Sequence, residues 1–387
     1  MRILQFGRFN NAQQNGGVER HQQLLCQGLA AQGLDVVYLV AGAGLKSSEV
    51  LVDGYRLIQA ASFGTAFSMA LSPAQVFKAL ALHKEKPFDV LHLHFPNPLA
   101  HLASLLFPAS VKRVITWHSD IIRQKRLLAL YLPFLQQVTR RADALVAATQ
   151  AHYSSSRQIP ADIPQNKRHV IPFGLDFASL ALTPHTTALC AELKVQANER
   201  PIIFALGRHV YYKGFDVLIE AMQHIDAQLI LGGDGPLRQS LQNQAAQLGV
   251  SNKIKFTGSI AEADLAAYFH ACEVFCLPSV EQSEAFGLVQ LEAMACAKPV
   301  ICTQLNNGVN VLNVHGETGF AVPVHDSKAL AQRINQLLSD PVLRQQLGEQ
   351  AQNRALHVYS LPAMTASHVR LYQDLVQQAH ATATHKH

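Results

Sequence analysis

Short apolar runs alternate with helix-like runs from one end of this chain to the other. Runs of this length and order predict parallel β-sheets that are covered by helices on both faces. The fold class that follows is α/β, with doubly wound sheets. The predicted strands are Arg2–Phe6, Val36–Val40, Val90–His94, Val114–Trp117, Ala144–Ala147, His169–Pro172, Ile202–Leu206, Gln228–Leu231, Ile254–Phe256, Val274–Leu277, Pro299–Cys302 and Gly319–Val322.

The strands form two series, and a chain of 387 residues is too long for one ordinary core. We therefore expect two Rossmann-like domains, residues 1–174 and 175–360, because a less regular stretch runs from Gly174 to Pro201. A final segment, residues 361–387, begins with a helical pattern over Leu361–Ala379. Further helices are predicted at Val18–Gln32, Ala74–His83, Leu127–Arg141, Phe215–Met222, Pro236–Gly249, Glu262–Cys272 and Ser327–Ser339.

Two glutamates follow the predicted strand Val274–Leu277. Glu284 lies on a small, glycine-containing turn, and Glu292 lies on an otherwise apolar helix-like run, Leu288–Ala297. Most glutamates on helices are simply solvated, but a solvated glutamate normally has polar neighbours on its face. We therefore interpret both carboxylates as functional, because they can accept hydrogen bonds from the hydroxyl groups of a ribose and of a sugar.

The start of the same helix supplies unpaired backbone N–H groups. Such amides, together with the positive end of the helix dipole, suit a phosphate. Phosphate, ribose and sugar together describe a nucleotide sugar, so this segment predicts a site for one. The amides concerned are those of Gly287, Leu288 and Val289.

Two cations follow the predicted strand Ile202–Leu206. Arg208 comes after Gly207, and Lys213 comes before Gly214. A guanidinium fork and an ammonium point charge together suit a pyrophosphate, and glycines let the backbone approach it. As ordinary surface cations they would be commonplace, but their position after a strand favours diphosphate binding. They would then meet the negative charge that develops as a nucleoside diphosphate departs.

The N-terminal half contributes four further candidates. Gly16 and Gly17 lie between a polar loop and a helix, where they are either a flexible hinge or backbone donors for the donor phosphates. His118 ends the strand Val114–Trp117, where a histidine can be structural or can face a ligand. Asp120 is a candidate for acceptor contact or for a base, and it can equally cap a helix that starts at Ile121.

These motifs together resemble the retaining glycosyltransferases of family 4, which carry an E-x7-E signature and have the GT-B fold. The resemblance covers nearly the whole chain, and its six motifs occur in the family's order. The matching segments are Gly16 to Arg20, Thr116 to Asp120, Ile171 to Asp176, Gly207-Arg208 with Lys213-Gly214, Gly232 to Pro236, and Glu284 to Glu292.

The resemblance implies two Rossmann-like domains that face a central cleft, with a C-terminal helix that crosses back to the N-terminal domain. It implies that the N-terminal domain lies on the acceptor side and that the C-terminal domain binds the nucleotide sugar. It places Glu284 and His118 at the donor sugar and Glu292 at the ribose. It also implies retention of anomeric configuration, usually described as a front-face reaction, with double displacement left open.

Several kinds of cofactor site are missing from the sequence. There is no Asp-x-Asp pair, no HExxH or comparable metal-ligand spacing, no G-x-G-x-x-G after the first strand and no Walker sequence. We therefore expect no metal and no cofactor besides the donor. The six cysteines form no CxxC pair, and no apolar run is long enough to span a membrane, so we expect a cytoplasmic protein.

The charge is distributed unevenly along the chain. Residues 1–174 hold 18 Lys and Arg against 9 Asp and Glu, and much of this excess lies in the stretch Lys112–Arg141. Basic residues mixed with leucines suit an anionic bilayer or a lipid pyrophosphate. The alternative is an ordinary helix whose apolar face packs inward. Nucleic acid is not expected, because no aromatic residues alternate with the charges as a stacking platform.

The sequence therefore predicts a metal-independent hexosyltransferase. The donor would be GDP-mannose or a UDP-hexose, and the acceptor a hydroxyl group, with a lipid-linked saccharide of envelope polysaccharide synthesis favoured. Peripheral contact with the inner face of the cell membrane is a further expectation. Two alternatives stay open: a sugar-nucleotide epimerase of the same architecture, and a nucleotide-sugar-binding protein that has lost catalysis.

Overall fold

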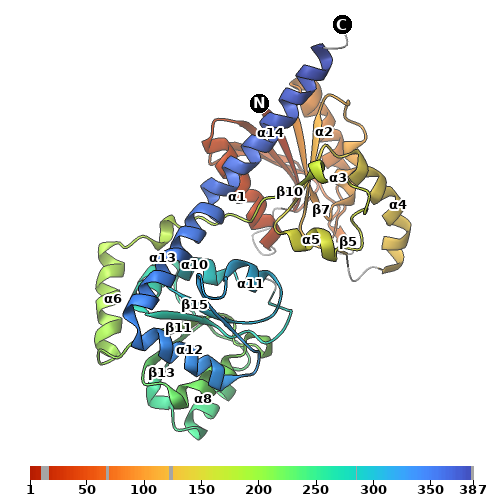
Figure 1. Cartoon of the computed structure of the whole chain (residues 1–387). Coiled ribbons are helices and arrows are strands. Elements are labelled where there is room, and N and C mark those ends of the chain that lie inside the picture. Colours follow the sequence, from red (N-terminus) through yellow and green to blue (C-terminus); the bar gives the residue numbers. More distant parts are fainter. Residues whose placement is uncertain (10–16, 67–68, 122–124, 285, 385–387) are drawn as a thin grey trace. The chain divides into compact units, whose positions relative to one another are not determined.

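The computed structural model describes residues 1–9, 17–66, 69–121, 125–284 and 286–384 of the chain (Figure 1). The chain divides into two compact units. Unit 1 comprises Met1–Leu175 together with Leu361–His387, and unit 2 comprises Asp176–Ser360. The sequence placed the boundary after Gly174, and the structure divides the chain after Leu175.

Unit 1 is built on an eight-stranded sheet with the order β10-β9-β8-β7-β1-β2-β4-β3. All neighbours in it are parallel except the hairpin of β3 and β4. A short pair, β5 (Thr65–Ala66) and β6 (Met69–Ala70), stands apart. The strands of the large sheet are β1 (Arg2–Phe9), β2 (Asp35–Ala41), β3 (Ser48–Val52), β4 (Tyr55–Ala60), β7 (Val90–Phe95), β8 (Lys112–Trp117), β9 (Ala144–Ala147) and β10 (Arg168–Val170).

The β3–β4 hairpin is absent from the sequence-based prediction. Four of the five residues of β3 are exposed, so the strand has no buried apolar run that would reveal it. The turn between the two strands is Asp53-Gly54, and both residues have positive φ angles, of 44° and 83°. Two-residue hairpin turns prefer the sequence Asp-Gly, so Asp53-Gly54 could have indicated this hairpin from the sequence.

Helices cover both faces of this sheet. They are α1 (Gly17–Ala31), α2 (Pro73–Glu85), α3 (Pro98–Ser104), α4 (Lys125–Arg141), α5 (Gln150–Ser155) and α14 (Leu361–Thr384). Residues of α2, α3 and α4 share one buried apolar cluster, and residues of α1 and α14 share another. The last helix of the chain therefore belongs to the core of unit 1 (Figure 1).

Unit 2 is built on a six-stranded parallel sheet with the order β13-β12-β11-β14-β15-β16. Its strands are β11 (Ile202–Leu206), β12 (Gln228–Gly232), β13 (Ile254–Gly258), β14 (Val274–Leu277), β15 (Val300–Thr303) and β16 (Gly319–Val322). Its helices are α6 (Pro184–Gln196), α7 (Phe215–Ala221), α8 (Arg238–Gln247), α9 (Leu265–Ala271), α10 (Val289–Ala295), α11 (Gly308–Leu312), α12 (Ser327–Ser339) and α13 (Pro341–Val358).

The stretch that the sequence left irregular, after Gly174, contains helix α6. Pro184 occupies its first turn, and Thr183 and Thr186 form a reciprocal capping box at its start. Only Thr186 and Leu193 of α6 are buried, so the helix shows little of the apolar spacing that identifies the others.

Each large sheet has a point at which the order of its strands reverses. It lies between β1 and β7 in unit 1 and between β11 and β14 in unit 2. In open α/β sheets, ligands bind beyond the carboxyl ends of the strands at such a point. Both units therefore have a place where a ligand site is expected. Among the described residues, no helix is long and apolar enough to cross a membrane.

Candidate functional site

The reversal point of unit 2 brings together two of the predicted residues. Lys213 ends the short 3-10 helix η3 (Tyr211–Lys213) after β11, and Glu284 lies on the loop after β14. The Lys213 Nζ and Glu284 Oε2 atoms are 2.5 Å apart, and the two side chains are only 12% and 10% exposed. A charge-assisted contact of this length in a partly dehydrated place is strong and fixes both groups.

Other polar groups hold Glu284 in place. The Ser279 hydroxyl donates to Glu284 Oε2 at 3.0 Å. The Asn307 side chain donates through Nδ2 to the backbone carbonyl of Glu284 at 2.7 Å. The carboxylate and its loop are therefore held from three directions, which gives the rigid placement that a binding group needs.

Glycines allow the backbone around Lys213 to pack closely. Gly214 has a φ of +64°, and a Cβ atom there would collide with the Pro278 carbonyl oxygen of the neighbouring loop. At Gly207, a Cβ atom would lie 3.2 Å from Lys213 Cε and 3.3 Å from Nζ. The Lys213 side chain thus folds back over Gly207, so these two glycines set the path by which the ammonium reaches Glu284.

Arg208 lies at the same edge of the sheet, directly after β11. Its side chain is exposed and makes no hydrogen bond or ion pair with any residue that the structure describes. A guanidinium with unused N–H donors at a strand end can receive an anionic ligand.

The segment after Glu284 leads into α10. Gly287 has a φ of +59° and is buried, Leu288 is the N-cap, and the helix begins at Val289. The N–H groups of a first helical turn have no partner within the helix. Glu292 lies further along α10 and is partly buried. Ala285 lies outside the described residues.

Unit 1 holds a group of buried histidines beside the predicted His118. His118 follows β8 and is 9% exposed, and its Nε2 atom lies 3.1 Å from His94 Nδ1 on β7. His94 Nε2 pairs in turn with Gln5 Oε1 at 2.8 Å. His21, on α1, is buried, and within the part of the chain that the structure describes neither of its ring nitrogens has a hydrogen-bond partner. The sequence singled out His118 and missed His21, because nothing along the chain links α1 to the end of β8.

The three histidines are held in the neutral form. Burial lowers the pKa of His118 to about 3 and lowers those of His21 and His94 well below the ordinary value. Neutral imidazoles donate and accept hydrogen bonds without adding charge, and they can also ligate a transition metal. One ring nitrogen from each lies within 4.8 Å of the other two, so among the described residues this is the group that could hold such an ion.

Asp120 accepts three hydrogen bonds within unit 1. Its Oδ1 atom accepts from Trp117 Nε1 at 3.0 Å and from the Ser156 hydroxyl at 2.6 Å. Its Oδ2 atom accepts from the Arg157 backbone N–H at 3.0 Å. Ile121 is not helical, so Asp120 caps no helix at that residue. These bonds favour a positioning role over that of a base, because both carboxylate oxygens are engaged.

The predicted glycine pair lies mostly outside the described residues. Gly16 is not described, and Gly17 is the first residue of α1. Their proposed contact with donor phosphates therefore stays a prediction.

Comparison with known proteins identifies the family. Residues 15–179 match the model described as Glycosyltransferase Family 4, and residues 192–354 match Glycosyl transferases group 1. A glycosyltransferase structure from Rickettsia africae covers 97% of this chain and 98% of its own, with a TM-score of 0.75 and 22% identity.

Two curated relatives span nearly the full length. O-antigen chain mannosyltransferase C of Escherichia coli is 28% identical over 379 residues, which are 97% of this chain and 99% of that protein. D-rhamnosyltransferase WbpZ of Pseudomonas aeruginosa is 32% identical over 366 residues, or 93% of this chain and 92% of that protein. With its two parallel-sheet units, the chain has the GT-B fold and belongs to the family 4 glycosyltransferases.

Proposed function

We propose that this glycosyltransferase moves a hexosyl unit from a nucleotide sugar to a hydroxyl acceptor with retention of configuration. The observation that supports this most is the Lys213–Glu284 pair beside the exposed Arg208, at the strand-order reversal of unit 2. It combines cations for a diphosphate with a carboxylate for sugar hydroxyls. Parallel α/β sheets bind their ligands at such a place.

In this proposal the donor diphosphate is bound by Arg208, by Lys213 and by the first amides of α10, those of Gly287, Leu288 and Val289. Negative charge grows on the diphosphate as the bond to the sugar breaks, and preorganised donors stabilise it. Glu292 accepts hydrogen bonds from the ribose. No divalent ion is needed for this step, because protein cations and amides supply the positive charge.

Glu284 has two tasks in this account. It orients the Lys213 ammonium, to which it lies 2.5 Å away, and its carboxylate accepts hydrogen bonds from the hydroxyls of the donor sugar. His118, kept neutral by burial that lowers its pKa to about 3, is proposed as a hydrogen-bonding group for that sugar. Asp120 is proposed to position the segment that bears His118, through its bonds to Trp117 and Ser156.

The sugar we favour is mannose, carried by GDP. Support comes from the Escherichia coli relative, whose name gives it as an O-antigen chain mannosyltransferase. That name also supports a saccharide acceptor in surface polysaccharide synthesis, for which we propose a lipid-linked form. A UDP-hexose is the alternative donor, because base recognition through main-chain groups leaves little trace in residue identity.

The decisive assay is release of nucleoside diphosphate, measured with and without acceptor and with EDTA present. A transferase releases GDP from GDP-mannose faster when a lipid-linked saccharide is added, and NMR of the product shows the donor's anomeric configuration. Conversion of the donor sugar without GDP release would indicate the epimerase. Binding without any turnover would indicate a non-catalytic protein, and loss of transfer in EDTA would contradict metal independence.

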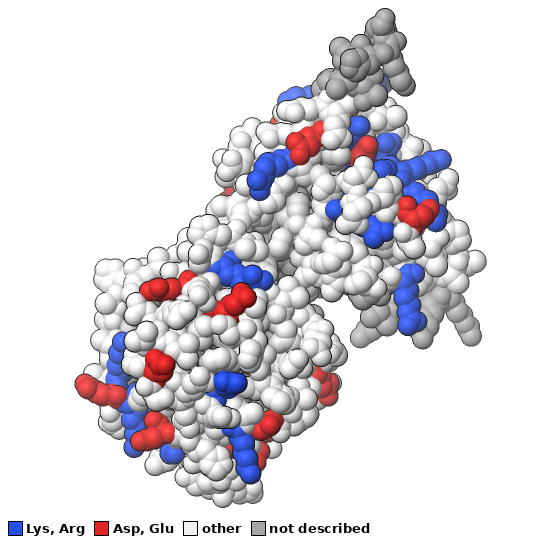
Figure 2. Space-filling model, viewed as in Figure 1, with Lys and Arg blue, Asp and Glu red and all other residues white. Residues whose placement is uncertain are grey.

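Peripheral membrane contact through Lys112–Arg141 is part of the same proposal. Some of the charge of this stretch is balanced locally, because Lys112 pairs with Asp143 and Arg140 pairs with Asp162. The face drawn in Figure 2 likewise intersperses basic with acidic side chains. Arg123 lies outside the described residues. In favour of membrane contact, Leu130 of α4 is 83% exposed, as expected of a helix that inserts into the membrane–water interface.

A flotation assay with anionic vesicles tests this contact. Changing Arg123, Lys125 and Arg126 together to Glu should weaken binding, because each cation near an anionic surface contributes about 1 kcal/mol. The control reverses the same number of charges elsewhere in unit 1, at Lys46, Lys78 and Lys84. If both variants bind the vesicles equally well, membrane contact through Lys112–Arg141 is excluded.

A further inference from the structure

Unit 1 contains an apolar pocket that the family match does not explain. It has a volume of about 500 Å³, within the range of small-molecule sites. It lies where the strand order reverses between β1 and β7, because Arg8 belongs to the end of β1 and Pro96 follows β7. The residues that line it are Arg8, Phe63, Ala70, Leu71, Ser72, Pro73, Pro96, Asn97, Pro98 and Leu99.

The side-chain polar atoms of Ser72 and Asn97 are occupied within the protein. The Ser72 hydroxyl donates to the Ala61 carbonyl at 2.6 Å, and Asn97 Nδ2 donates to the Gly7 carbonyl at 3.1 Å. Asn97 Oδ1 accepts from the Ala100 N–H at 3.2 Å. These contacts leave few groups that could bind the hydroxyls of a sugar, so the pocket interior suits an apolar occupant.

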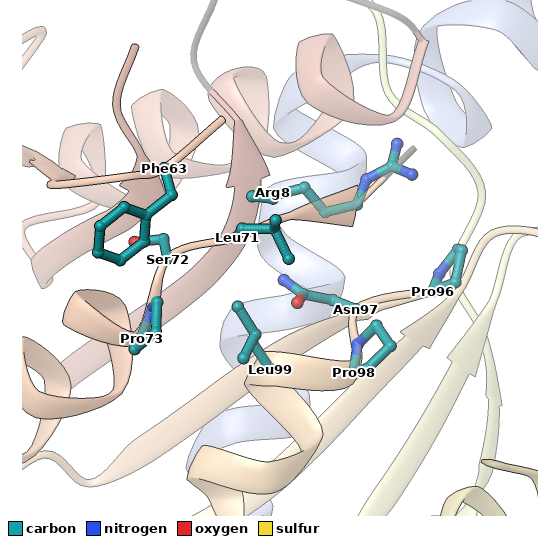
Figure 3. A pocket seen from close by; sticks show the side chains of 10 residues that line it. Arg8, Phe63, Leu71, Ser72, Pro73, Pro96, Asn97, Pro98 and Leu99 are labelled. Atoms are coloured by element: carbon teal, nitrogen blue, oxygen red, sulfur yellow. The ribbon is translucent and has the colours of Figure 1, made fainter. Parts of the chain in front are cut away.

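Apolar side chains around the pocket lie open. Phe63 is 76% exposed and Leu71 is 45% exposed, and Figure 3 shows both beside Leu99 around one space. The backbone that presents them is fixed, because the Phe63 N–H donates to the Leu71 carbonyl and the Leu71 N–H donates to the Gly64 carbonyl, each at 2.9 Å. Covering such a fixed, exposed apolar surface with an apolar ligand is favourable, because it removes that surface from water.

Arg8 is the charged side chain of the lining. Its Nη2 atom donates to Glu19 Oε1 at 2.7 Å, which holds the guanidinium, and its buried Nε atom has no hydrogen-bond partner among the described residues. Figure 3 shows the Arg8 side chain along one edge of the pocket, with Phe63 and Pro73 toward the other. The pocket thus has an apolar body and, on one side, the cationic side chain of Arg8, which is 20% exposed.

From this combination we infer that the pocket binds the hydrocarbon chain of an anionic amphiphile, with its phosphate near Arg8. The inference rests on the proposed function, because it assigns the pocket to the lipid part of the acceptor. An acyl chain and a prenyl chain share the chemistry that the lining recognises.

The test is calorimetric titration of the whole chain with butyl, hexyl and octyl phosphate, each below its micelle concentration. Affinity should rise about two- to fourfold per added methylene, as expected for burial of a hydrocarbon. Citronellyl phosphate, compared with decyl phosphate, distinguishes a prenyl from a linear chain. Affinity that does not depend on chain length would overturn the inference.

Two exposed leucines provide matched variants. Leu71→Asp places a charge in the pocket and should weaken octyl phosphate binding at least tenfold, whereas Leu102→Asp, on the 49% exposed Leu102 of α3 outside the pocket, should not. Equal affinity of the two variants would also overturn it. Alkyl phosphates contain no nucleotide, so this result stands apart from the GDP-release assay that tests the transferase itself.

Discussion

At the scale of single residues, the Lys213–Glu284 pair is the centre of the account. Both side chains are about nine-tenths buried, and their charged atoms are 2.5 Å apart. An ion pair in such a place is a poor means of gaining stability, because dehydration of the charges offsets their attraction. Its location at the strand-order reversal, where parallel α/β sheets bind ligands, favours a functional explanation instead.

Lys213→Ala should therefore affect turnover far more than the surface variant Lys328→Ala. Removal of one donor that stabilises transition-state charge lowers kcat by about 10²- to 10³-fold in other enzymes. The measurement is initial-rate GDP release, with circular dichroism to show that the variant is folded. A folded Lys213→Ala variant with wild-type kcat would exclude Lys213 from the reaction.

Gly214 gives a second prediction at this scale. Gly214→Ala would push its Cβ into the Pro278 carbonyl, whereas Gly249→Ala, at a similar φ of +70°, meets nothing within 4 Å. Gly249→Ala should lower the free energy of unfolding by about 1 kcal/mol, because alanine disfavours the left-handed backbone conformation. Gly214→Ala should lower it by several times that amount. Urea unfolding compares them, and equal losses would show that the close approach of the two loops is not needed.

At the scale of elements, α14 packs into the core of unit 1 against elements that are distant from it in the sequence. The Tyr372 hydroxyl lies 2.6 Å from His92 Nδ1 and accepts from Gln5 Nε2 at 3.3 Å. Met364, Leu371 and Leu375 belong to the same buried cluster as residues of α1 and β2. The end of the chain thus completes a unit that the first strand begins.

Tyr372→Phe removes only a hydroxyl, yet with it go two buried hydrogen bonds, to His92 Nδ1 and Gln5 Nε2. Such a loss costs about 1–3 kcal/mol. The control is Gln373→Ala, because Gln373 is the adjacent, exposed residue of the same helix. Trp117 is the one tryptophan of the chain and lies buried in unit 1, so its fluorescence during urea unfolding reports the stability of that unit. Identical midpoints for the two variants would contradict the packing described for α14.

The helices and strands also show which elements could be predicted from the sequence and which could not. β11 and β14 begin and end where the sequence predicted, because both are continuous apolar runs that are buried on both faces. β3 and α6 were missed because most of their side chains are exposed, so the apolar pattern is weak there.

In the candidate site, too, the sequence indicated single residues but not the contacts between distant parts of the chain. Arg208, Lys213, Glu284 and Glu292 were predicted as site residues from their types and positions, but the contact between Lys213 and Glu284 was not predicted. That contact depends on β11 and β14 being neighbours, which only the strand order reveals. The histidine group shows the same limit, because His21 and His118 come from distant parts of the chain.

At the scale of the whole molecule, we expect a group of buried, neutral histidines to make the stability of unit 1 sensitive to acid. His21, His92, His94, His118 and His368 all belong to unit 1. Burial lowers the pKa of each below its ordinary value of 6.5, to about 4 for His368. Between these values the unfolded state binds more protons, so the stability of unit 1 falls as the pH falls below about 6.5.

Trp117 fluorescence should therefore report a lower free energy of unfolding at pH 5.5 than at pH 7.5. Each histidine that stays neutral contributes a loss of up to about 1.4 kcal/mol per pH unit. His368→Leu should reduce the loss by about one such amount, and His224→Gln, on an exposed histidine of unit 2, should not change it. A pH-independent midpoint would mean that these histidines are protonated in the folded chain.

The central claim is that cations and amides of unit 2 bind the donor diphosphate without a divalent ion. Calorimetric titration of the whole chain with GDP and with UDP, in EDTA, tests it most directly. We predict one-to-one binding of one of the two nucleotides, weakened about ten- to a hundredfold by Arg208→Ala and unchanged by Lys328→Ala. Binding that requires Mg²⁺, or that is the same in Arg208→Ala as in the wild type, would contradict it.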